Sequence, residues 1–475
     1  MELKQEDVPE PVSPTGQYFN SSVLSVSVLC ILESEIPIDD SSTMALLKDL
    51  FLPINPRFSS IMVMDKDGAK QWKKVEVKLS DHVNVPIFPA GKSHEFYDNY
   101  LNEYLSKIAM DQLPQSRPLW EIYIIKYPTS NGAGSLIFKL HHALGDGFSL
   151  MGALLSCLQR ADNPSLPLTF PKFQANPKLD SEVEEEGIFK SVPRVFSRIV
   201  NTVSDFGWSL LKSSLVEDDR SPIRSGDDGV EFRPITITTM TFSLDHIKQI
   251  KANLQVTIND VITGIFFFGT RLYMQATSQK LNNAHSTALV LLNTRNIGGY
   301  KSVHDMIKPN STETSWGNQF GFLHVSVPNL NGADDSSNPI DFVFKAQQMI
   351  KQKRNSAAVY LTGRLLETLR KYRGPEATAG YIHSTLKNSS MTVSNMIGPV
   401  EQMALANHPI RGLHFMVVGV PQSLTITMMS YMGKLRVAVG TERGLIDPQK
   451  FRSCIENAFD IMFKAAVKFA AQANS

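Results

Sequence analysis

Apolar residues recur along this chain in two spacings, one typical of strands and the other typical of helices. Alternating or β-branched apolar runs predict strands at 17–33, 122–126, 135–140, 235–242, 287–292, 320–327, 424–431 and 434–439. Apolar residues at helical spacing predict helices at 148–160, 260–275, 340–353, 357–371 and 448–471. Strands and helices are mixed along the whole chain, so the pattern predicts an α/β (mixed α+β) fold.

Two polar stretches interrupt this pattern and divide the chain. Residues 161–187 are rich in Pro, Asn and Glu, and residues 216–234 are charged and expected to be mobile. A chain of 475 residues is too long for one simple core. We therefore predict an N-terminal domain at 1–175, a linker at 176–234 and a C-terminal domain at 235–475.

The predicted linker contains an amphipathic stretch at 188–212. Its apolar residues recur at helical spacing, and Lys190, Arg194, Arg198 and Lys212 lie off that stripe. A helix that is apolar on one side and basic on the other suits the surface of an anionic membrane. The same stripe also suits packing on the protein's own core, so the sequence leaves both interpretations open.

Composition excludes several classes of protein. The net charge is only +1, so no overall field favours nucleic acid. The three cysteines, Cys30, Cys157 and Cys454, are far apart, which predicts neither a disulfide framework nor a metal site and indicates reducing surroundings. The first residues lack the apolar core of a secretory signal, and no apolar run is long enough to span a bilayer.

The stretch with the clearest chemical character is HHALGDG at 141–147, between a predicted strand and a predicted helix. The preceding strand is expected to pair with the strand at 122–126 as a hairpin. Neutral imidazole is the side chain best suited to accept a proton near pH 7. Neighbouring strand residues point to opposite faces, so His141 and His142 cannot both face one substrate. Asp146 either bonds His142 or anchors the loop, and two ordinary strand-end histidines remain the alternative.

This stretch resembles the HHxxxDG motif of the wax ester synthase/diacylglycerol acyltransferase family, within the HxxxD group of CoA-dependent acyltransferases. Three further elements are similar to elements of that family, and all four have the same order along the chain as in the family. They are PLW at 118–120, before the histidines, and ND at 259–260 and NMIGP at 395–399, after them. The resemblance runs from about residue 11 to about residue 470 and is greatest to the plant branch. It implies two similarly folded domains with an active-site tunnel between them.

The resemblance also implies the reaction. A long-chain acyl group would move from acyl-CoA, a substrate rather than a cofactor, to a long-chain alcohol (giving a wax ester) or to diacylglycerol (giving triacylglycerol). His142 would be the general base, with no metal. The implied location is the endoplasmic reticulum membrane, bound peripherally on the cytosolic side, with the plasma membrane as an alternative.

Two other functions stay open at this point. One is a soluble HxxxD acyltransferase of small alcohols or amines, because DFGWS at 205–209 resembles a motif of such plant enzymes. That motif lies far downstream in those enzymes but soon after the histidines here, so we interpret it as coincidence. The other is a catalytically weak lipid-binding protein that uses the same tunnel.

The catalytic candidates in the HHxxxDG motif are His142, Asp146 and His141, and further site residues follow from the other family elements. In related enzymes an arginine placed like Arg295 forms a salt bridge with the motif aspartate, here Asp146. Asn259 is a candidate oxyanion donor or a helix cap. The remaining candidates are expected to leave room beside the histidines or to line the tunnel: Gly147, Asn395, Gly398 and the run 316–318 (WGN).

Overall fold

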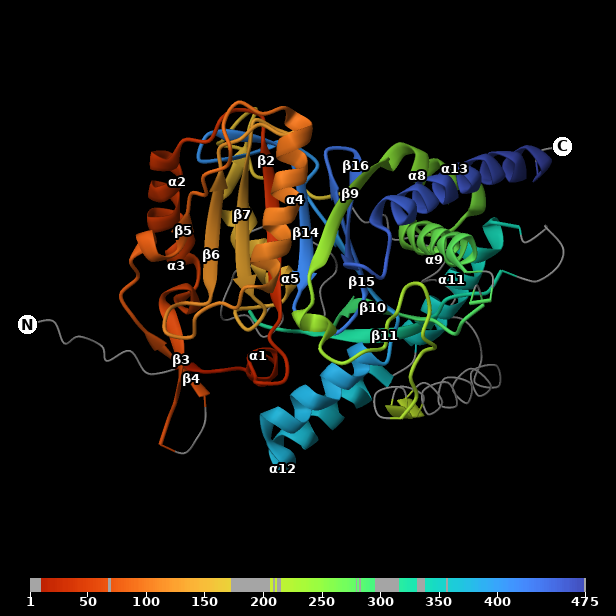
Figure 1. The fold of residues 1–475 in the computed structure, drawn as a ribbon, viewed down its shortest axis with the longest axis horizontal. Coiled ribbons are helices and arrows are strands. Elements are labelled where there is room, and N and C mark those ends of the chain that lie inside the picture. The colour runs from red at the N-terminus through yellow and green to blue at the C-terminus, as the bar shows by residue number, and fades with distance from the viewer. Residues whose placement is uncertain are drawn as a thin grey trace, which may run out of the picture.

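The computed structural model describes residues 10–66, 70–171, 206–207, 210–211, 215–278, 280–281, 283–294, 316–330, 338–355 and 358–473. Two large sheets dominate the fold and lie next to each other, each with helices packed against it (Figure 1). A small third sheet has the order β1 (Glu10–Pro11), β4 (Lys70–Lys74) and β3 (Ser60–Met64). The prediction of a mixed α/β fold with two similarly built halves is confirmed.

The first large sheet has seven strands. Their order is β5 (Val83–Asn84), β6 (Trp120–Ile125), β7 (Gly134–His141), β2 (Ser27–Ser34), β14 (His408–Val418), β13 (Met403–Leu405) and β8 (Leu158–Arg160). β6 and β7 form the predicted antiparallel hairpin. Every residue of β2, β6 and β7 is buried, because both faces of the sheet are covered.

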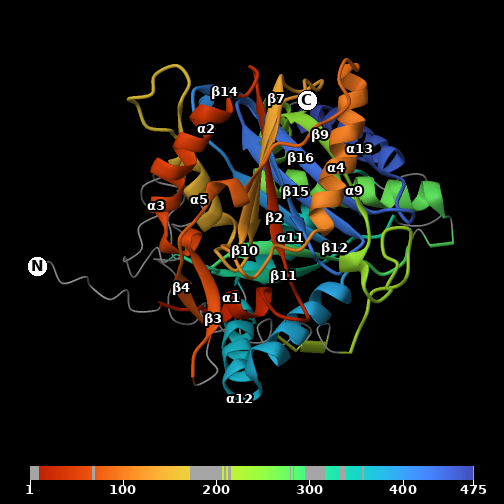
Figure 2. The same ribbon diagram turned by 60° about the vertical axis from the view of Figure 1, so that its left-hand side comes forward.

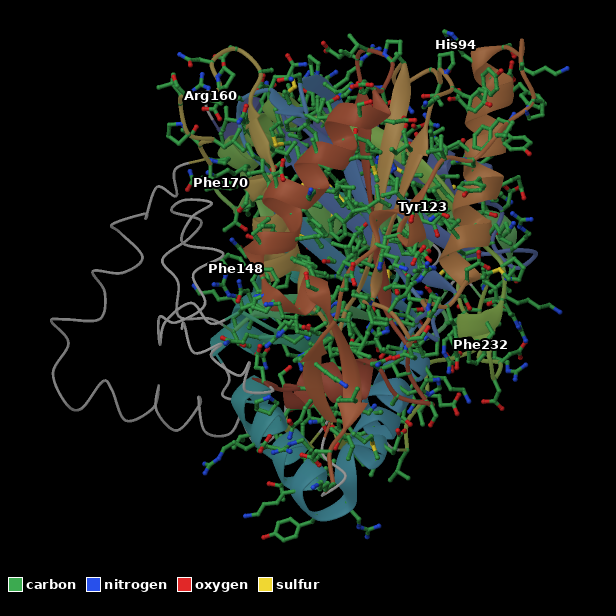
Figure 3. All side chains as sticks on the ribbon, turned by 90° about the vertical axis from the view of Figure 1, so that its left-hand side faces the viewer. His94, Tyr123, Phe148, Arg160, Phe170 and Phe232 are labelled. Atoms are coloured by element: carbon green, nitrogen blue, oxygen red, sulfur yellow. The ribbon has the colours of Figure 1, made fainter. Side chains whose placement is uncertain are left out.

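Helices cover this sheet on both sides. α4 (His94–Met110) packs on the face that carries Leu29 and Ile31. The opposite face, with Val28 and Cys30, packs against α5 (Gly147–Ser156) and the residues around α2 (Asp40–Leu46) and α3 (Leu52–Ile54). Tyr18 and Phe19 of α1 (Pro14–Phe19) pack instead in a separate cluster with Leu289 and Ala379. Figures 2 and 3 show α4 and α5 on these two sides, with Tyr123 of β6 facing α4 and His94 at the outer end of that helix.

The second large sheet has six strands. Their order is β11 (Phe320–Ser326), β10 (Thr287–Asn293), β12 (Met391–Ile397), β15 (Leu424–Tyr431), β16 (Lys434–Glu442) and β9 (Ile235–Ser243). Its core packs against α8 (Leu244–Leu254), α9 (Ile258–Thr277), α11 (Ile340–Asn355) and α13 (Pro448–Ala473). α12 (Ala358–Lys387) is broken at Gly374, where φ is 84°, and projects from the body of the molecule (Figure 1). No helix in the described part of the chain is long and apolar enough to cross a bilayer.

Strands from the end of the chain complete the first sheet. β13 and β14 belong to the predicted C-terminal domain, yet β14 pairs with β2 and β13 pairs with β8. Pairing with β13 also explains why α5 ends at Ser156, before the predicted helix end at 160, because residues 158–160 join the sheet as β8. The division into three segments stays a prediction, but it assigns residues 403–418 to the C-terminal domain although β13 and β14 belong to the first sheet.

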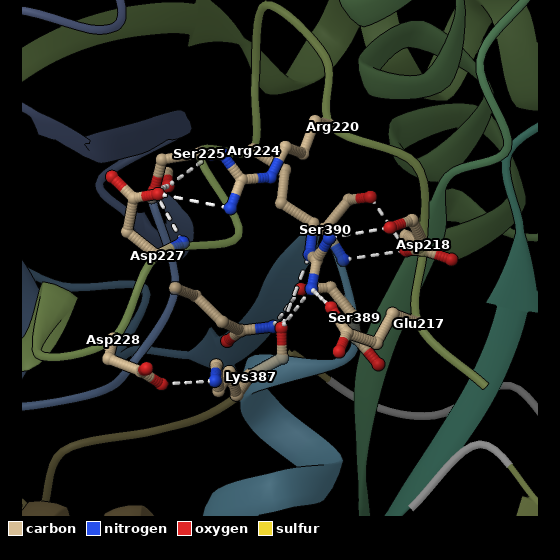
Figure 4. Close-up of polar contacts among 12 residues, drawn as sticks. Glu217, Asp218, Arg220, Arg224, Ser225, Asp227, Asp228, Lys387, Ser389 and Ser390 are labelled. Atoms are coloured by element: carbon tan, nitrogen blue, oxygen red, sulfur yellow. Dashed lines mark hydrogen bonds and ion pairs between the residues drawn. The ribbon is translucent and has the colours of Figure 1, made fainter. Parts of the chain in front are cut away.

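The expectation that residues 216–234 are mobile is wrong for their first half, which is bound to the second sheet. The buried carboxylate of Asp218 accepts hydrogen bonds from the backbone N–H groups of Thr287 (2.7 Å) and Ser390 (2.8 Å). Arg224, buried beside it, donates to the backbone carbonyl of Lys387 (Figure 4). Buried charges persist where hydrogen bonds satisfy them, so this polar stretch is part of the folded unit. Most of the amphipathic stretch 188–212 lies outside the described residues.

Candidate active site

The loop between β7 and α5 carries the histidines. Its backbone is fixed at its start, where the N–H of His142 donates to the carbonyl of Val26 (2.8 Å). Asp146 then caps α5, because its Oδ1 accepts from the backbone N–H of Ser149 (3.0 Å). A strand end and a capped helix start therefore hold both ends of HHALGDG.

The same loop is bonded to residues 316–319, which lead into β11 of the other large sheet. The Trp316 indole donates to the carbonyl of Leu144 (2.6 Å), and the backbone N–H of Gln319 donates to Oδ2 of Asp146 (2.9 Å). The Ser149 hydroxyl donates to the carbonyl of Gly317 (3.1 Å). The loop is thus positioned jointly by the two halves of the molecule.

Hydrogen bonds with Asn318 identify the proton-bearing nitrogen of His142. The Asn318 amide nitrogen lies 2.9 Å from the backbone carbonyl of His142, which can only accept. That contact fixes the orientation of the amide, so Oδ1 faces His142 Nδ1 at 2.7 Å and must accept its proton. The Nδ1–H tautomer leaves the lone pair on Nε2, which makes Nε2 the nitrogen able to act as a base.

The surroundings of His142 keep the ring neutral. The side chain packs against the rings of Phe19 and Phe320, with centroids 4.7 and 5.5 Å away, and the residue is 6% exposed. Burial lowers the pKa of His142, while the charge of Asp146 opposes that shift. A neutral imidazole at physiological pH is the form needed to accept a proton.

His141 has the opposite tautomer and a different role. The backbone N–H of Ala143 donates to its Nδ1 (3.1 Å), so Nε2 carries the proton and donates to the Ser25 hydroxyl (3.1 Å). Burial, with the neighbouring charges, lowers the pKa of His141 to about 3. Both ring nitrogens are used within the protein, which favours a role in holding the loop over the predicted catalytic role of His141.

A mostly apolar pocket lies beside His142. Its wall includes residues of both sheets and of α5: Val28, Cys30, Leu140, Asp146, Gly147, Phe148, Leu150, Met151, Leu154, Leu291, Asn293, Gln319, Phe320, Ser394, Asn395, Met396, Phe415 and Val417. His142 is in this wall and His141 is not. The predicted opposite placement of the two histidines is therefore what the structure has.

Asp146 is held by backbone groups of both halves, as described above. Its expected partner Arg295 lies outside the described residues, so that salt bridge stays a prediction. Gly147 is the first residue of α5, and an added Cβ would approach the sulfur of Met396 to 3.1 Å. A larger residue there would press on the pocket wall, which agrees with the predicted need for space.

The other family elements meet at the pocket in an unexpected way. Thr257, not Asn259, caps α9, and Asp260 completes the capping box, so the alternative of Asn259 as a helix cap is wrong. The side-chain oxygen Oδ1 of Asn259 instead accepts a hydrogen bond from the side-chain amide of Asn395 (2.8 Å), and Asn395 lines the pocket. Gly398 follows β12 and donates its N–H to the carbonyl of Ser430 (3.0 Å). A Cβ on Gly398 would clash with that carbonyl, so its role is close backbone approach.

Sequence reasoning placed residues 316–318 at the tunnel but missed what they do. The role of Asn318 depends on a contact with His142 across 176 positions, which periodicity cannot reveal. Phe19 and Ser25 were missed entirely, because nothing in their local sequence distinguishes them from core residues. Trp120 of the PLW element is fully buried and donates to the carbonyl of Phe58 (2.8 Å), as expected for a core role.

Two family models match the chain. The model of the wax ester synthase/diacylglycerol acyltransferase catalytic domain matches residues 55–262, and the model of the WS/DGAT C-terminal domain matches residues 316–463. Arabidopsis thaliana wax ester synthase/diacylglycerol acyltransferase 4 is 28% identical over 94% of this chain and 86% of its own length. Arabidopsis thaliana wax ester synthase/diacylglycerol acyltransferase 11 is 27% identical over 96% and 95%.

Solved structures share the fold at low identity. The wax ester synthase/diacylglycerol acyltransferase from Marinobacter aquaeolei VT8 has a TM-score of 0.58 and 14% identity, covering 96% of this chain and 99% of that one. The starter condensation domain of rhizomide synthetase has a TM-score of 0.52 and 11% identity, covering 97% and 94%. These similarities concern the arrangement of the two sheets.

Proposed function

Because the chain belongs to the wax ester synthase/diacylglycerol acyltransferase family, we propose that it transfers a long-chain acyl group from acyl-CoA to a hydroxyl of a lipid. The acceptor is a long-chain alcohol, diacylglycerol or both. The observation that carries this proposal is His142, a neutral base whose Nε2 lone pair is available at an apolar pocket. The two alternatives from the sequence receive no support, since full-length relatives carry the acyltransferase name.

The proposed reaction needs one base that becomes an acid. His142 Nε2 takes the proton of the acceptor hydroxyl while the oxygen attacks the thioester carbonyl carbon, forming a tetrahedral oxyanion. The C–S bond then breaks, and the imidazolium returns the proton to the sulfur of departing CoA. Atoms and charges balance without a covalent enzyme intermediate.

Two features support this chemistry beyond the base itself. The side-chain oxygen Oδ1 of Asn318 stabilises the imidazolium that forms on His142, because Nδ1–H donates to it throughout the reaction. The pocket that His142 shares with α5 offers apolar side chains such as Leu150, Met151 and Leu154 to a hydrocarbon chain. We assign the Asn395 amide, held by Asn259, as the candidate donor to the oxyanion.

The substrates also suggest where the enzyme works. Long-chain alcohols, diacylglycerol and their esters reside in lipid, so the proposal places the protein peripherally on a membrane. By resemblance to the plant branch, the proposed membrane is that of the endoplasmic reticulum on its cytosolic side, with the plasma membrane as the alternative.

The test is ester synthesis by purified protein. Labelled acyl-CoA is supplied with a long-chain alcohol or with diacylglycerol in detergent micelles, and products are separated by thin-layer chromatography. We expect labelled wax ester or triacylglycerol, and His142→Ala should abolish most of it. If wild-type protein forms neither ester from any chain length, the proposed function is wrong.

A further inference from the structure

A second cavity lies on the side of the molecule toward His141. Its volume is about 390 Å³, and its lining includes Asn20, Ser25 and Ser27. Ser25 is the residue whose hydroxyl accepts from His141, and Ser27 pairs with His141 across β2 and β7. The cavity therefore lies next to residues that hold His141 and is separate from the pocket already described.

Exposed apolar side chains line this cavity. They come from four separate segments: Val23 from the loop after α1, Met64 from the end of β3, Met110 from the end of α4, and Phe232. Met64 is 68% exposed and Phe232 is 61% exposed. Figure 3 shows Phe232 at the edge of the molecule, with His94 at the far end. Large exposed apolar side chains that gather at one opening mark a site of contact with an apolar partner.

Positive charge is concentrated beside this opening. Before its break at Gly374, α12 has four basic residues and one acid, Glu367, which forms an ion pair with Arg370 (2.6 Å). The four basic residues are Arg364, Arg370, Lys371 and Arg373. Tyr372, within this group, is 74% exposed.

The basic residues of α12 and the exposed apolar residues of the cavity are on the same side of the molecule. α12 packs against α1, and the Ser22 hydroxyl donates to the carboxylate of Glu376, two residues after the break (3.1 Å). Ser22 and Glu376 both line the cavity. In Figures 1 and 2, α12 projects from the same end of the molecule at which β3, β4 and α1 lie.

We infer that this side of the protein docks on an anionic lipid bilayer, so that the cavity opens directly against the lipid. We call it the α12 face, and define it by Val23, Met64, Met110, Phe232 and the four basic residues of α12. Basic residues near a membrane are attracted by anionic headgroups, and the apolar residues enter the boundary between headgroups and acyl chains. The inference rests on the proposed function, because a lipid acceptor is what such docking would deliver.

The test is flotation of the full chain with vesicles of phosphatidylcholine alone or with phosphatidylserine added. A basic variant combines Arg364→Gln, Lys371→Gln and Arg373→Gln. A matched control combines Lys251→Gln, Lys464→Gln and Lys468→Gln, exposed residues of α8 and α13 at the other end of the molecule (Figure 1). We expect the basic variant to lose about tenfold or more of its partition onto anionic vesicles, and the control to keep it.

An apolar variant, Met64→Ser with Phe232→Ser, should lose partition onto both kinds of vesicle, because its missing contribution is independent of headgroup charge. Equal flotation of wild type and both variants, with melting temperatures unchanged, would overturn the inference. A basic variant that floats normally but has a raised KM for acyl-CoA in micelles would assign the charge to the acyl donor instead. A change only in oligomeric state would assign it to a second copy of the chain.

Activity in micelles separates this inference from the proposed function. The basic variant and the control should keep the wild-type kcat when the alcohol is supplied in detergent, since none of their changed residues lines either cavity. Loss of ester synthesis by the wild type in micelles would contradict the proposed function, whatever the flotation result.

Discussion

Replacing Asn318 tests whether the orientation of His142 depends on its amide. Asn318→Leu keeps the size of the side chain but removes two hydrogen bonds, of 2.7 and 2.9 Å, to the ring and to the backbone carbonyl of His142. Each such bond contributes about 0.5–1.5 kcal/mol, so the free energy of unfolding should fall by about 2 kcal/mol. The ring can then adopt the other tautomer, and kcat should fall about 10- to 100-fold, part of the contribution of general-base catalysis.

The matched substitution Asn318→Asp separates positioning from stability. A carboxylate at this place still accepts from Nδ1 but favours the imidazolium, so it raises the pKa of His142 from its lowered value. Because the base must be unprotonated, the acidic limb of the kcat profile should move to higher pH, whereas in Asn318→Leu it should not.

The assay is ester formation from labelled acyl-CoA between pH 5.5 and 9, with kcat and KM fitted at each pH and melting temperatures recorded alongside. A stable Asn318→Leu protein with wild-type kcat would refute the tautomer assignment. So would an Asn318→Asp profile whose acidic limb has not moved.

Four further outcomes follow from the same site and its surroundings. His142→Ala should lose about a hundredfold or more of kcat, and His141→Ala less, in the same acyl-transfer assay. Asp146→Asn should lower activity and melting temperature together, because it weakens a helix cap and a bond to the other sheet; lost activity at an unchanged melting temperature would instead make it a proton carrier. Gly398→Ala should lower the free energy of unfolding by about 1–3 kcal/mol through overpacking, and the melting temperature with it; a normal melting temperature would contradict the close approach of the backbone. The pKa of His141 in the folded protein, about 3, lies below its unfolded value of about 6.5. The stability that the neutral ring allows is therefore complete above pH 6.5 and falls by about 1.4 kcal/mol per pH unit between pH 6.5 and 3. Calorimetry of His141→Gln should show a smaller loss of stability in acid.

Local sequence was sufficient for the elements whose determinants are local. The β6–β7 hairpin, the glycine-rich loop after His141 and the long C-terminal helix were all predicted, since alternation, glycine and a Pro448 start act over a few residues. α5 was predicted too long because its last residues leave the helix to pair with β13, and no periodicity signals a partner so far along the chain.

The candidate site divides in the same way. His142 and Asp146 were found from their motif, and the opposite facing of His141 followed from strand geometry. Asn259 was a candidate helix cap because Asn is a good capping residue, but Thr257 is two positions earlier and occupies the cap. The choice between them depends on where the helix begins, which is the least certain feature of a sequence-based interpretation.

The location of Asn318 shows why this site needs the whole chain. The base comes from the first sheet and the amide that orients it comes from the second, while β13 and β14 return to complete the first sheet. The two halves therefore cannot be separated by a cut between them, because the first sheet would lose β14, the strand paired with β2 next to the histidine strand. The base is correctly oriented only when both sheets are assembled. This arrangement couples catalytic competence to the packing of the complete fold.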